Sequence, residues 1–215
     1  SIMTAGMTVQ AKLPFNDTDG HWGEAAIEYV VENGLMNGVG NGESFAPNMS
    51  LTRGMVVTVL YRDNGSPKQP FKGKFLDVKD GAYYTAAAEW AYENGIVTGY
   101  DNGNFGPADL ITRQELAVVL SRMIKYLEAK MPDSPQIDKF TDGGKIASWV
   151  AEHAETMRKA GLMKGDANGN FNATNNASRA EVATIISRML PHSGRIAVVE
   201  NGKSDYVIVI DENDS

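Results

Sequence analysis

Apolar residues recur along this chain at helical spacing, in pairs of short stretches separated by turns. Residues 22–33 carry one apolar stripe, made by Ala26, Ile27, Val30 and Val31. Residues 85–94 and 149–160 carry equivalent stretches, and after a turn each of the three is followed by a second apolar stretch that opens on a Thr or Ser. The pattern therefore predicts an all-α protein built from three helix-turn-helix units.

The three units are copies of one another, because the same residue types recur in the same order. Each copy opens on a Phe-x-Asp motif, has an aromatic residue at the entry of its first helix, and ends that helix on a glycine 12 residues after the aromatic. The aspartates are Asp17, Asp77 and Asp142, the aromatics are Trp22, Tyr83 and Trp149, and the closing glycines are Gly34, Gly95 and Gly161. We expect these glycines to adopt the left-handed backbone that terminates helices.

Two further glycine sets follow in every copy. Asn-Gly pairs with a Phe after them are typical of turns that pin a loop to the core. The other set, four residues after the helix-ending glycine, has no such local explanation, and we interpret it as leaving room for a ligand beside the backbone. It consists of Gly38, Gly99 and Gly165.

The second helix of each copy begins with a capping residue and then an arginine, namely Arg53, Arg113 or Arg179. In the second and third copies a Glu completes a capping box, which accounts for the Thr, Ser and Glu. An arginine at this position faces the positive end of the helix dipole, at a cost of roughly a few tenths of a kcal/mol. We therefore expect an anion beside each arginine.

Two sources could supply that anion. The first is internal, since Asp17, Asp77 and Asp142 recur in step with the arginines. The second is a ligand carboxylate or phosphate, gripped by the arginine together with backbone N–H groups. The residue pattern leaves both open, and the two can coexist.

Composition excludes several classes of function. The chain has 20 Lys and Arg against 27 Asp and Glu, a net charge of -7, which disfavours a general nucleic-acid binder. It has no cysteine, so thiol catalysis, disulfides and thiolate metal sites are excluded. Its longest apolar runs are far shorter than the ~20 residues that span a bilayer, so we expect no membrane span.

Metal and catalytic sites are not predicted either. The Asp- and Asn-rich loops at 100–104 and 166–170 lack the glycine at the sixth position and the bidentate glutamate at the twelfth position of a calcium loop, which favours ordinary turns. The three histidines are too dispersed for a zinc site, and no nucleophile and base recur together. We therefore expect no cofactor, no metal and no enzymatic activity.

Taken together, the recurring motifs resemble the S-layer homology repeats of bacterial cell-surface proteins. The resemblance covers three tandem copies, at residues 13–63, 74–128 and 139–191. It rests on Phe-x-Asp, the aromatic at the helix entry, the glycine-terminated helix, the Asn-Gly-x-Phe-x-Pro turn and the Thr-Arg-x-Glu helix start. Residues 1–12 are then a lead-in. Residues 192–215 contain two β-branched runs that predict a hairpin, and they form a linker or the start of a further domain.

The resemblance implies one pseudo-threefold unit, with grooves between neighbouring repeats, in a secreted protein at the cell wall. It also implies noncovalent binding of a secondary cell-wall polysaccharide that carries pyruvate ketals, which anchors the protein to the peptidoglycan layer. We expect the module to be a monomer. Two alternatives stay open: a protein-protein contact within a surface lattice, and an anchor for a larger glycan-active enzyme.

Carried over by motif, the resemblance implies four kinds of ligand contact. The arginines hold the ketal carboxylate, and the aspartates accept from a hydroxyl or orient the arginine. The glycines let the backbone approach the sugar. The aromatics offer a flat face, although packing in the core explains them equally well. The implied set is Arg53, Arg113, Arg179, Asp17, Asp77, Asp142, Trp22, Tyr83, Trp149, Gly38, Gly99 and Gly165.

The copies depart from the family pattern in different places. The first has Gly54-Met55 where the family has a small residue and Glu, and the third has Ala173 in place of the proline. The Thr-Arg-x-Glu start is intact in the second copy and nearly intact in the third, which has Ser178 for Thr. We therefore predict that one or two grooves dominate, those of Arg113 and Arg179, and that the site of Arg53 is the weakest.

Overall fold

The computed structural model of the chain describes residues 13–134, 137–189, 195–200 and 203–208. Six α-helices form in this part, two in each repeat, which confirms the predicted all-α repeats. Their bounds are α1 Glu24–Glu32, α2 Arg53–Asp63, α3 Thr85–Glu93, α4 Arg113–Tyr126, α5 Ala151–Lys159 and α6 Arg179–Met189. A short 3-10 helix, η1, spans Gly143–Lys145.

The first helix of each repeat begins about two residues later than the apolar pattern predicts, except α3, which begins as expected. Trp22 and Trp149 lie in the turn before α1 and α5, so they belong to the loop and not to the helix. The predicted ends are confirmed: Gly34, Gly95 and Gly161 have φ angles of 67°, 70° and 70°. Each helix closes in a Schellman motif, as in α1, where Leu35 N–H donates to Val30 O.

The second helices begin as their capping residues predict. The hydroxyl oxygens of Thr52 and Thr112 accept from the backbone N–H of Met55 and Glu115. Ser178 does the same for Glu181, whose carboxylate accepts from Ser178 N–H and completes the capping box.

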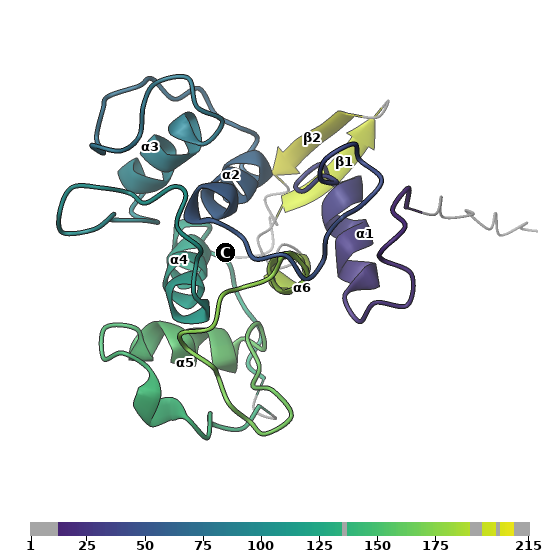
Figure 1. Cartoon of the computed structure of the whole chain (residues 1–215), viewed down its shortest axis with the longest axis vertical. Helices are drawn as coiled ribbons and strands as arrows, with labels where there is room; N and C mark the ends of the chain where they lie inside the picture. Colours follow the sequence, from purple (N-terminus) through teal and green to yellow (C-terminus); the bar gives the residue numbers. More distant parts are fainter. Residues whose placement is uncertain (1–12, 135–136, 190–194, 201–202, 209–215) are drawn as a thin grey trace, which may run out of the picture.

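The helices of one repeat do not pack as a pair, which corrects the simple helix-turn-helix interpretation. The packed pairs are α1 with α6, α2 with α3, and α4 with α5. Each first helix therefore packs against the second helix of the preceding repeat, and α1 closes the ring on the third. Figure 1 shows α2, α4 and α6 gathered around the centre, with α1, α3 and α5 outside them.

A ring of backbone hydrogen bonds joins the three repeats at the centre. The N–H of Leu51 donates to Ala177 O, that of Ala177 to Ile111 O, and that of Ile111 to Leu51 O, at 3.0 to 3.1 Å. All three residues are buried, and the ring leaves no member with an open N–H or carbonyl. This closed circuit fixes the three repeats at equivalent positions around one core.

The core repeats as well. Phe45, Phe105 and Phe171, which follow the Asn-Gly turns, are fully buried and contact Phe15, Phe75 and Phe140 of the Phe-x-Asp motifs. These contacts seat each turn on the core, as the sequence predicts. No helix in the described part of the chain has the length and apolar character needed to cross a membrane.

The hairpin predicted in the tail is confirmed. Strand β1 spans Arg195–Glu200 and strand β2 spans Lys203–Ile208, and they pair antiparallel with Arg195 opposite Ile208. The second strand begins three residues earlier than the β-branched run suggests, because pairing extends to Lys203, which lies opposite Glu200. The lead-in at 1–12 lies outside the described residues.

Candidate functional site

The arginine at the start of each second helix reaches across to the next repeat. Arg53 donates from Nε to Phe105 O at 2.9 Å and from Nη1 to Glu115 Oε2 at 2.7 Å. The guanidinium also lies 4.6 Å from the ring centre of Tyr100. The anion beside this arginine is therefore the capping glutamate of the second repeat, which neither of the two sources considered from the sequence included.

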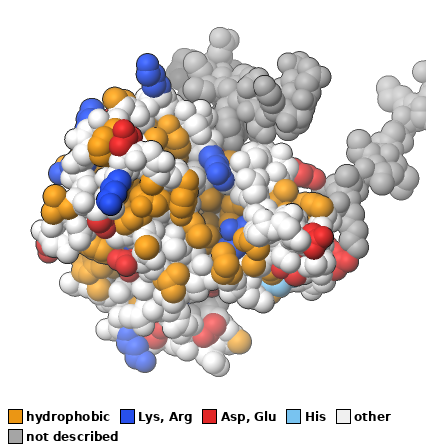
Figure 2. Space-filling model, turned by 45° about the horizontal axis from the view of Figure 1, so that its top comes forward, with side chains coloured by type: hydrophobic (Ala, Val, Ile, Leu, Met, Phe, Trp, Pro, Cys, Tyr) orange, Lys and Arg blue, Asp and Glu red, His pale blue; other side chains and the backbone are white. Residues whose placement is uncertain are grey.

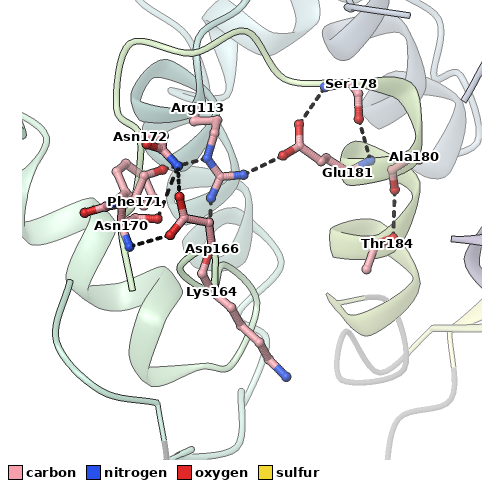
Figure 3. Close-up of polar contacts among 10 residues, drawn as sticks. All are labelled: Arg113, Lys164, Asp166, Asn170, Phe171, Asn172, Ser178, Ala180, Glu181 and Thr184. Atoms are coloured by element: carbon pink, nitrogen blue, oxygen red, sulfur yellow. Dashed lines mark hydrogen bonds and ion pairs between the residues drawn. The ribbon is translucent and has the colours of Figure 1, made fainter. Parts of the chain in front are cut away.

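Arg113 repeats this geometry between the second and third repeats, as Figure 3 shows. Its Nε donates to Phe171 O at 2.7 Å, its Nη1 to Glu181 Oε1 at 2.8 Å, and its Nη2 to Lys164 O at 3.2 Å. Three of the five N–H groups of a guanidinium are used in this way, which leaves two for an external acceptor.

Arg179 lies at the junction of the third and first repeats, and there the pattern breaks. Its Nε donates to Phe45 O at 2.8 Å and its Nη2 to Asn37 O. The first repeat carries Met55 in the position of Glu115 and Glu181. The described residues supply no carboxylate hydrogen bond to Arg179, which is only 7% exposed. Burial lowers the pKa of this guanidinium, and the charge of Asp17 partly opposes that effect.

This geometry changes which site is affected by Met55, the residue of the first repeat that departs from the family pattern. Each groove joins the arginine of one repeat to the glutamate position of the next. Met55 therefore alters the site of Arg179 and leaves that of Arg53 complete. The order of the sites expected from the sequence assumed that both residues of one motif serve one groove, and the structure contradicts that assumption.

The aspartates of the Phe-x-Asp motifs do not hydrogen-bond to the arginines. Instead, each carboxylate accepts two backbone N–H groups of the loop that follows the Asn-Gly turn. Asp77 accepts from Phe105 and Gly106 at 2.7 and 2.8 Å, and Asp17 and Asp142 do the same in their repeats. The predicted stapling of each repeat by hydrogen-bonded Asp–Arg pairs is therefore wrong: the aspartates hold loops, and Asp17 acts on Arg179 through its charge alone.

These loops need support because one residue in each has a left-handed backbone. The residues are Ala46, Gly106 and Asn172, with φ angles of 55°, 72° and 57°. In the third repeat burial acts to raise the pKa of Asp142, but the N–H groups of Phe171 and Asn172 outweigh it, and the pKa lies below its ordinary value.

The aromatic before each first helix is exposed. Trp22, Tyr83 and Trp149 are 66%, 62% and 60% exposed. The alternative that they pack in the core is therefore wrong. Each of the three therefore presents a large, rigid aromatic surface to solvent.

The glycines four residues after each helix end have a packing explanation. A Cβ on Gly38 would lie 2.6 Å from Phe15 Cε1, and one on Gly99 would lie 2.5 Å from Phe75 Cε1. At Gly165 it would lie 2.7 Å from backbone of Gly169. Close packing alone requires glycine here, which corrects the interpretation that only a ligand explains this set. A ligand contact at these glycines stays a prediction.

Two clefts lie at the arginines that have a glutamate partner. The first, the Arg53 groove, is a cleft of about 480 Å³ lined by Arg53, Gly99, Tyr100, Glu115, Arg122 and Trp149, among others. Residues of all three repeats meet here, because Trp149 precedes α5, which packs against α4. Burial and a hydrogen bond to Asp109 raise the pKa of Tyr100 to about 12, so its hydroxyl stays protonated.

The second, the Arg113 groove, is a cleft of about 220 Å³ lined by Trp22, Arg113, Lys164, Gly165, Glu181 and Arg188, among others. A polar cleft of about 190 Å³ adjoins it at Arg113 and contains Asn172, Asn175 and Asn176. Figure 2 shows one face of the molecule, where exposed hydrophobic side chains surround a hollow with Lys or Arg side chains at its edge.

The two grooves differ in charge. Three cations and one carboxylate line the Arg113 groove, namely Arg113, Lys164, Arg188 and Glu181. In the Arg53 groove the cations Arg53 and Arg122 are balanced by Asp101 and Glu115. The described lining of the Arg113 groove is therefore the more positive of the two, although Asp166 lines the cleft that adjoins it.

Sequence reasoning missed two sets of groove residues. It assigned Glu115 and Glu181 to capping alone, although each also pairs with an arginine of the preceding repeat. It did not identify Arg122 and Arg188, which lie nine residues after Arg113 and Arg179. The recurrence of an arginine at this spacing could have identified them from the sequence. In the described part of the chain, no His, Asp and Glu side chains cluster in a way that could hold a metal ion.

Comparison with known proteins identifies the family of the three repeats. The model of the S-layer homology domain matches three segments, residues 14–54, 74–117 and 139–183. The chain belongs to the S-layer homology family. Its three repeats are therefore S-layer homology domains, a non-catalytic module that binds cell-wall polymers, and the protein is a secreted one of the bacterial cell surface.

Its relatives include both surface-layer proteins and enzymes. An amylopullulanase of Thermoanaerobacterium thermosulfurigenes is 31% identical over 182 residues, 85% of this chain and 10% of the relative. The surface-layer 125 kDa protein of Lysinibacillus sphaericus is 28% identical over 202 residues, which are 92% of this chain and 16% of the relative. An S-layer protein of Bacillus thuringiensis subsp. finitimus is 29% identical over 186 residues, which are 86% of this chain and 22% of the relative.

The chain thus spans between a tenth and about a fifth of the length of these relatives. What they share with it is the S-layer homology region. This region of the chain is a cell-surface anchoring module.

Proposed function

We propose that this module binds a secondary cell-wall polysaccharide through carboxylates of its pyruvate ketals, in the Arg53 and Arg113 grooves. The observation that carries the proposal is the composition of these grooves. Each brings an arginine, a glycine-containing loop and an exposed tryptophan from three different repeats to one cleft.

The arginines can serve a ligand although they already have a glutamate partner. The described structure uses two N–H groups of Arg53 and three of Arg113, and a guanidinium has five. The glutamate and the carbonyl hold the guanidinium plane fixed, so a ligand carboxylate meets a preorganised donor. Lys164 adds a further cation to the Arg113 groove.

The tryptophans supply the apolar part of such a site. A sugar ring has flat faces of C–H groups, and an exposed indole is a large, rigid surface for them to cover. Trp22 and Trp149 stand 66% and 60% exposed at the edges of the two grooves. We propose that they stack on the ring that carries the ketal.

The Arg179 junction ranks below these two grooves in the proposal. Arg179 keeps a positive charge without a glutamate partner among the described residues, but its guanidinium is held against the ring of Phe45 at 4.4 Å. We therefore propose a mainly structural role for Arg179, which reverses the order of Arg53 and Arg179 expected from the sequence.

Binding to purified cell-wall sacculi tests the function, and hydrofluoric-acid stripping of the secondary polymer separates it from the alternatives. We expect retention on intact sacculi and loss after stripping. Retention that survives stripping would contradict the glycan function and favour a protein-protein contact in a surface lattice. Turnover of wall glycans by this chain would favour an enzymatic role instead.

Site variants locate the binding. Because Arg113→Gln also removes structural hydrogen bonds, Trp22→Ala and Trp149→Ala are the cleaner changes. We expect each to weaken binding of pyruvylated N-acetylmannosamine in calorimetry without changing the melting temperature. Phe71→Ala removes an exposed aromatic of the joint between repeats and is the matched control. Equal binding by all three variants would contradict the proposed grooves.

A further inference from the structure

A second arginine recurs on the second helices, nine residues after the one at the helix start. The three are Arg62 on α2, Arg122 on α4 and Arg188 on α6. Arg122 lines the Arg53 groove and Arg188 lines the Arg113 groove. Nine residues turn an α-helix through about two and a half turns, so the two arginines of one helix point to opposite sides and serve different grooves.

The groove wall that holds this arginine is a single helical stripe. In the Arg53 groove the stripe is Glu115, Val118, Val119 and Arg122. In the Arg113 groove the equivalent stripe is Glu181, Thr184, Ile185 and Arg188. These residues follow the i, i+3, i+4, i+7 spacing that places side chains on one face. The glutamate end of each stripe meets the arginine of the preceding repeat, and the other end carries the second arginine.

The spacing of the two ends follows from the helix. Seven residues separate the glutamate from the second arginine, a rise of about 10 Å along the axis. Each groove therefore has an arginine at either end of the stripe, one from the preceding repeat beside the glutamate and one on the stripe itself, with two intervening residues that are apolar except Thr184. This length exceeds a single sugar ring, so a ligand that reaches both ends extends along the groove.

The second arginines are not committed to partners within the described structure. Arg158, by comparison, makes two hydrogen bonds to Glu155. Among the described residues neither Arg122 nor Arg188 makes an ion pair, and each faces its groove. Arg122 is half-buried and Arg188 is exposed. Arginine is suited to bidentate contact with carboxylate or phosphate.

We propose that Arg122 and Arg188 bind a second anionic group of the polymer, about 10 Å along the chain from the group held at Arg53 or Arg113. The inference rests on the proposed function and deepens it. The preferred ligand is then a polyanion with charged groups at a repeating distance, and a single charged sugar fills half of each groove.

The proposal assigns separate tasks to the two arginines of a groove. The arginine at the helix start is held in place by the glutamate and the Phe carbonyl, and it binds the first carboxylate of the ligand. The second arginine has no such support in the described structure, so it adapts to the spacing of the next charged group. It acts as a specificity-determining residue for polymer length and charge.

The double variant Arg122→Gln and Arg188→Gln of the full chain tests this, with Lys68→Gln and Lys79→Gln as the control of equal charge change. Both lysines are exposed and lie in segments outside the described linings of the two grooves. Calorimetry compares two probes, pyruvylated N-acetylmannosamine and a wall-polymer fragment with two or more ketals, at low and high salt.

We expect the double variant to bind the single sugar like the unaltered chain and the fragment about tenfold or more weakly. Its salt dependence with the fragment should also fall, because fewer charges pair. An equal loss with both probes would overturn the inference by placing these arginines at the first anion site. No loss with the fragment would overturn it as well.

Two further outcomes separate the inference from the function on which it rests. No binding of either probe by the unaltered chain would overturn the proposed function and this inference with it. A further probe is the same fragment with its second ketal removed. If the double variant still binds this probe more weakly than the unaltered chain does, the second-carboxylate contact is overturned while the function stands. A loss that disappears together with the second ketal supports it.

Discussion

Glu115 Oε2 lies 2.7 Å from Arg53 Nη1, although the two residues belong to different repeats. The same glutamate also accepts from the hydroxyl of Thr112 and so supports the start of its own helix. One side chain therefore serves its own repeat and the preceding one. The Thr-Arg-x-Glu motif is a connector between repeats, and its two charged residues act in two different grooves.

Restoring this connector at the third junction should stabilise the protein. Met55→Glu places a carboxylate where Arg179 has none among the described residues, and we expect the melting temperature to rise by about 2–4 °C at neutral pH. The carboxylate pairs only when ionised, so its pKa is lowered by folding. The gain is present above the unfolded pKa and disappears as the pH falls through the folded one.

Met55→Gln controls for the change of shape without adding charge. Thermal unfolding at pH 7 and at about pH 3, below the ordinary pKa of glutamate, compares the two variants. Equal stabilisation by both variants, or a gain that persists in acid, would show that charge pairing with Arg179 is not its cause.

The aspartates that hold the loops should make the stability acid-sensitive. The pKa of Asp142 is lowered in the folded state, so the unfolded chain binds more protons and stability falls with decreasing pH. The contribution is complete above the unfolded value of about 3.9 and is lost as the pH falls through the lower folded value. Asp142→Asn should lower the free energy of unfolding by about 2 kcal/mol near neutral pH. The free energy of unfolding of this variant should also fall less steeply as the pH is lowered.

Urea unfolding from pH 7 downwards measures both effects. Asp138→Asn is the matched control, because Asp138 is exposed and makes no hydrogen bond to backbone N–H groups among those described. If the two variants gave the same pH profile, the carboxylate of Asp142 would not be the group that confers the acid sensitivity.

Gly99 should tolerate alanine poorly for a reason unrelated to any ligand. A Cβ there would lie 2.5 Å from Phe75 Cε1, at a φ of +76°. Gly81 has a similar φ of +83° with nothing near its Cβ position, so Gly81→Ala isolates the cost of the backbone alone. We expect a loss of about 1 kcal/mol for Gly81→Ala and about 2–4 kcal/mol for Gly99→Ala in denaturant unfolding. Similar losses in both variants would contradict the packing explanation.

Removing the third repeat should destabilise the first. Because α1 packs against α6 and the ring of Leu51, Ile111 and Ala177 needs all three members, a chain ended at residue 138 leaves α1 without its partner. Hydrogen exchange should show loss of protection over Glu24–Glu32, although this helix is unchanged in sequence. Retained protection there would mean that a repeat folds by itself.

Several parts of the structure could be predicted because their causes are local. Gly34 ends its helix through a left-handed backbone, and Thr112 caps its helix with its own hydroxyl, so both could be identified from residue type and spacing. The fully buried Phe105 after the Asn-Gly turn belongs to the same class. The repeat itself follows from counting positions.

The partners across repeats could not be predicted, because they depend on how the repeats interlock. In the sequence Asp77 and Arg113 recur in step and suggest a pair, yet Asp77 holds its own loop and Arg113 meets Glu181, 68 residues away. The exposure of Trp22 also depends on its place in the turn before α1, beside residues of α6 in the Arg113 groove, which no local pattern reports.

The helices, their caps, their ends and the three copies follow from residue order, since each depends on neighbours within about one or two turns of chain. Which arginine meets which glutamate, and which tryptophan lines which groove, depends on the packing of the repeats. Each first helix packs on the preceding repeat, so every cleft contains residues from different repeats. The two grooves are a property of the closed ring.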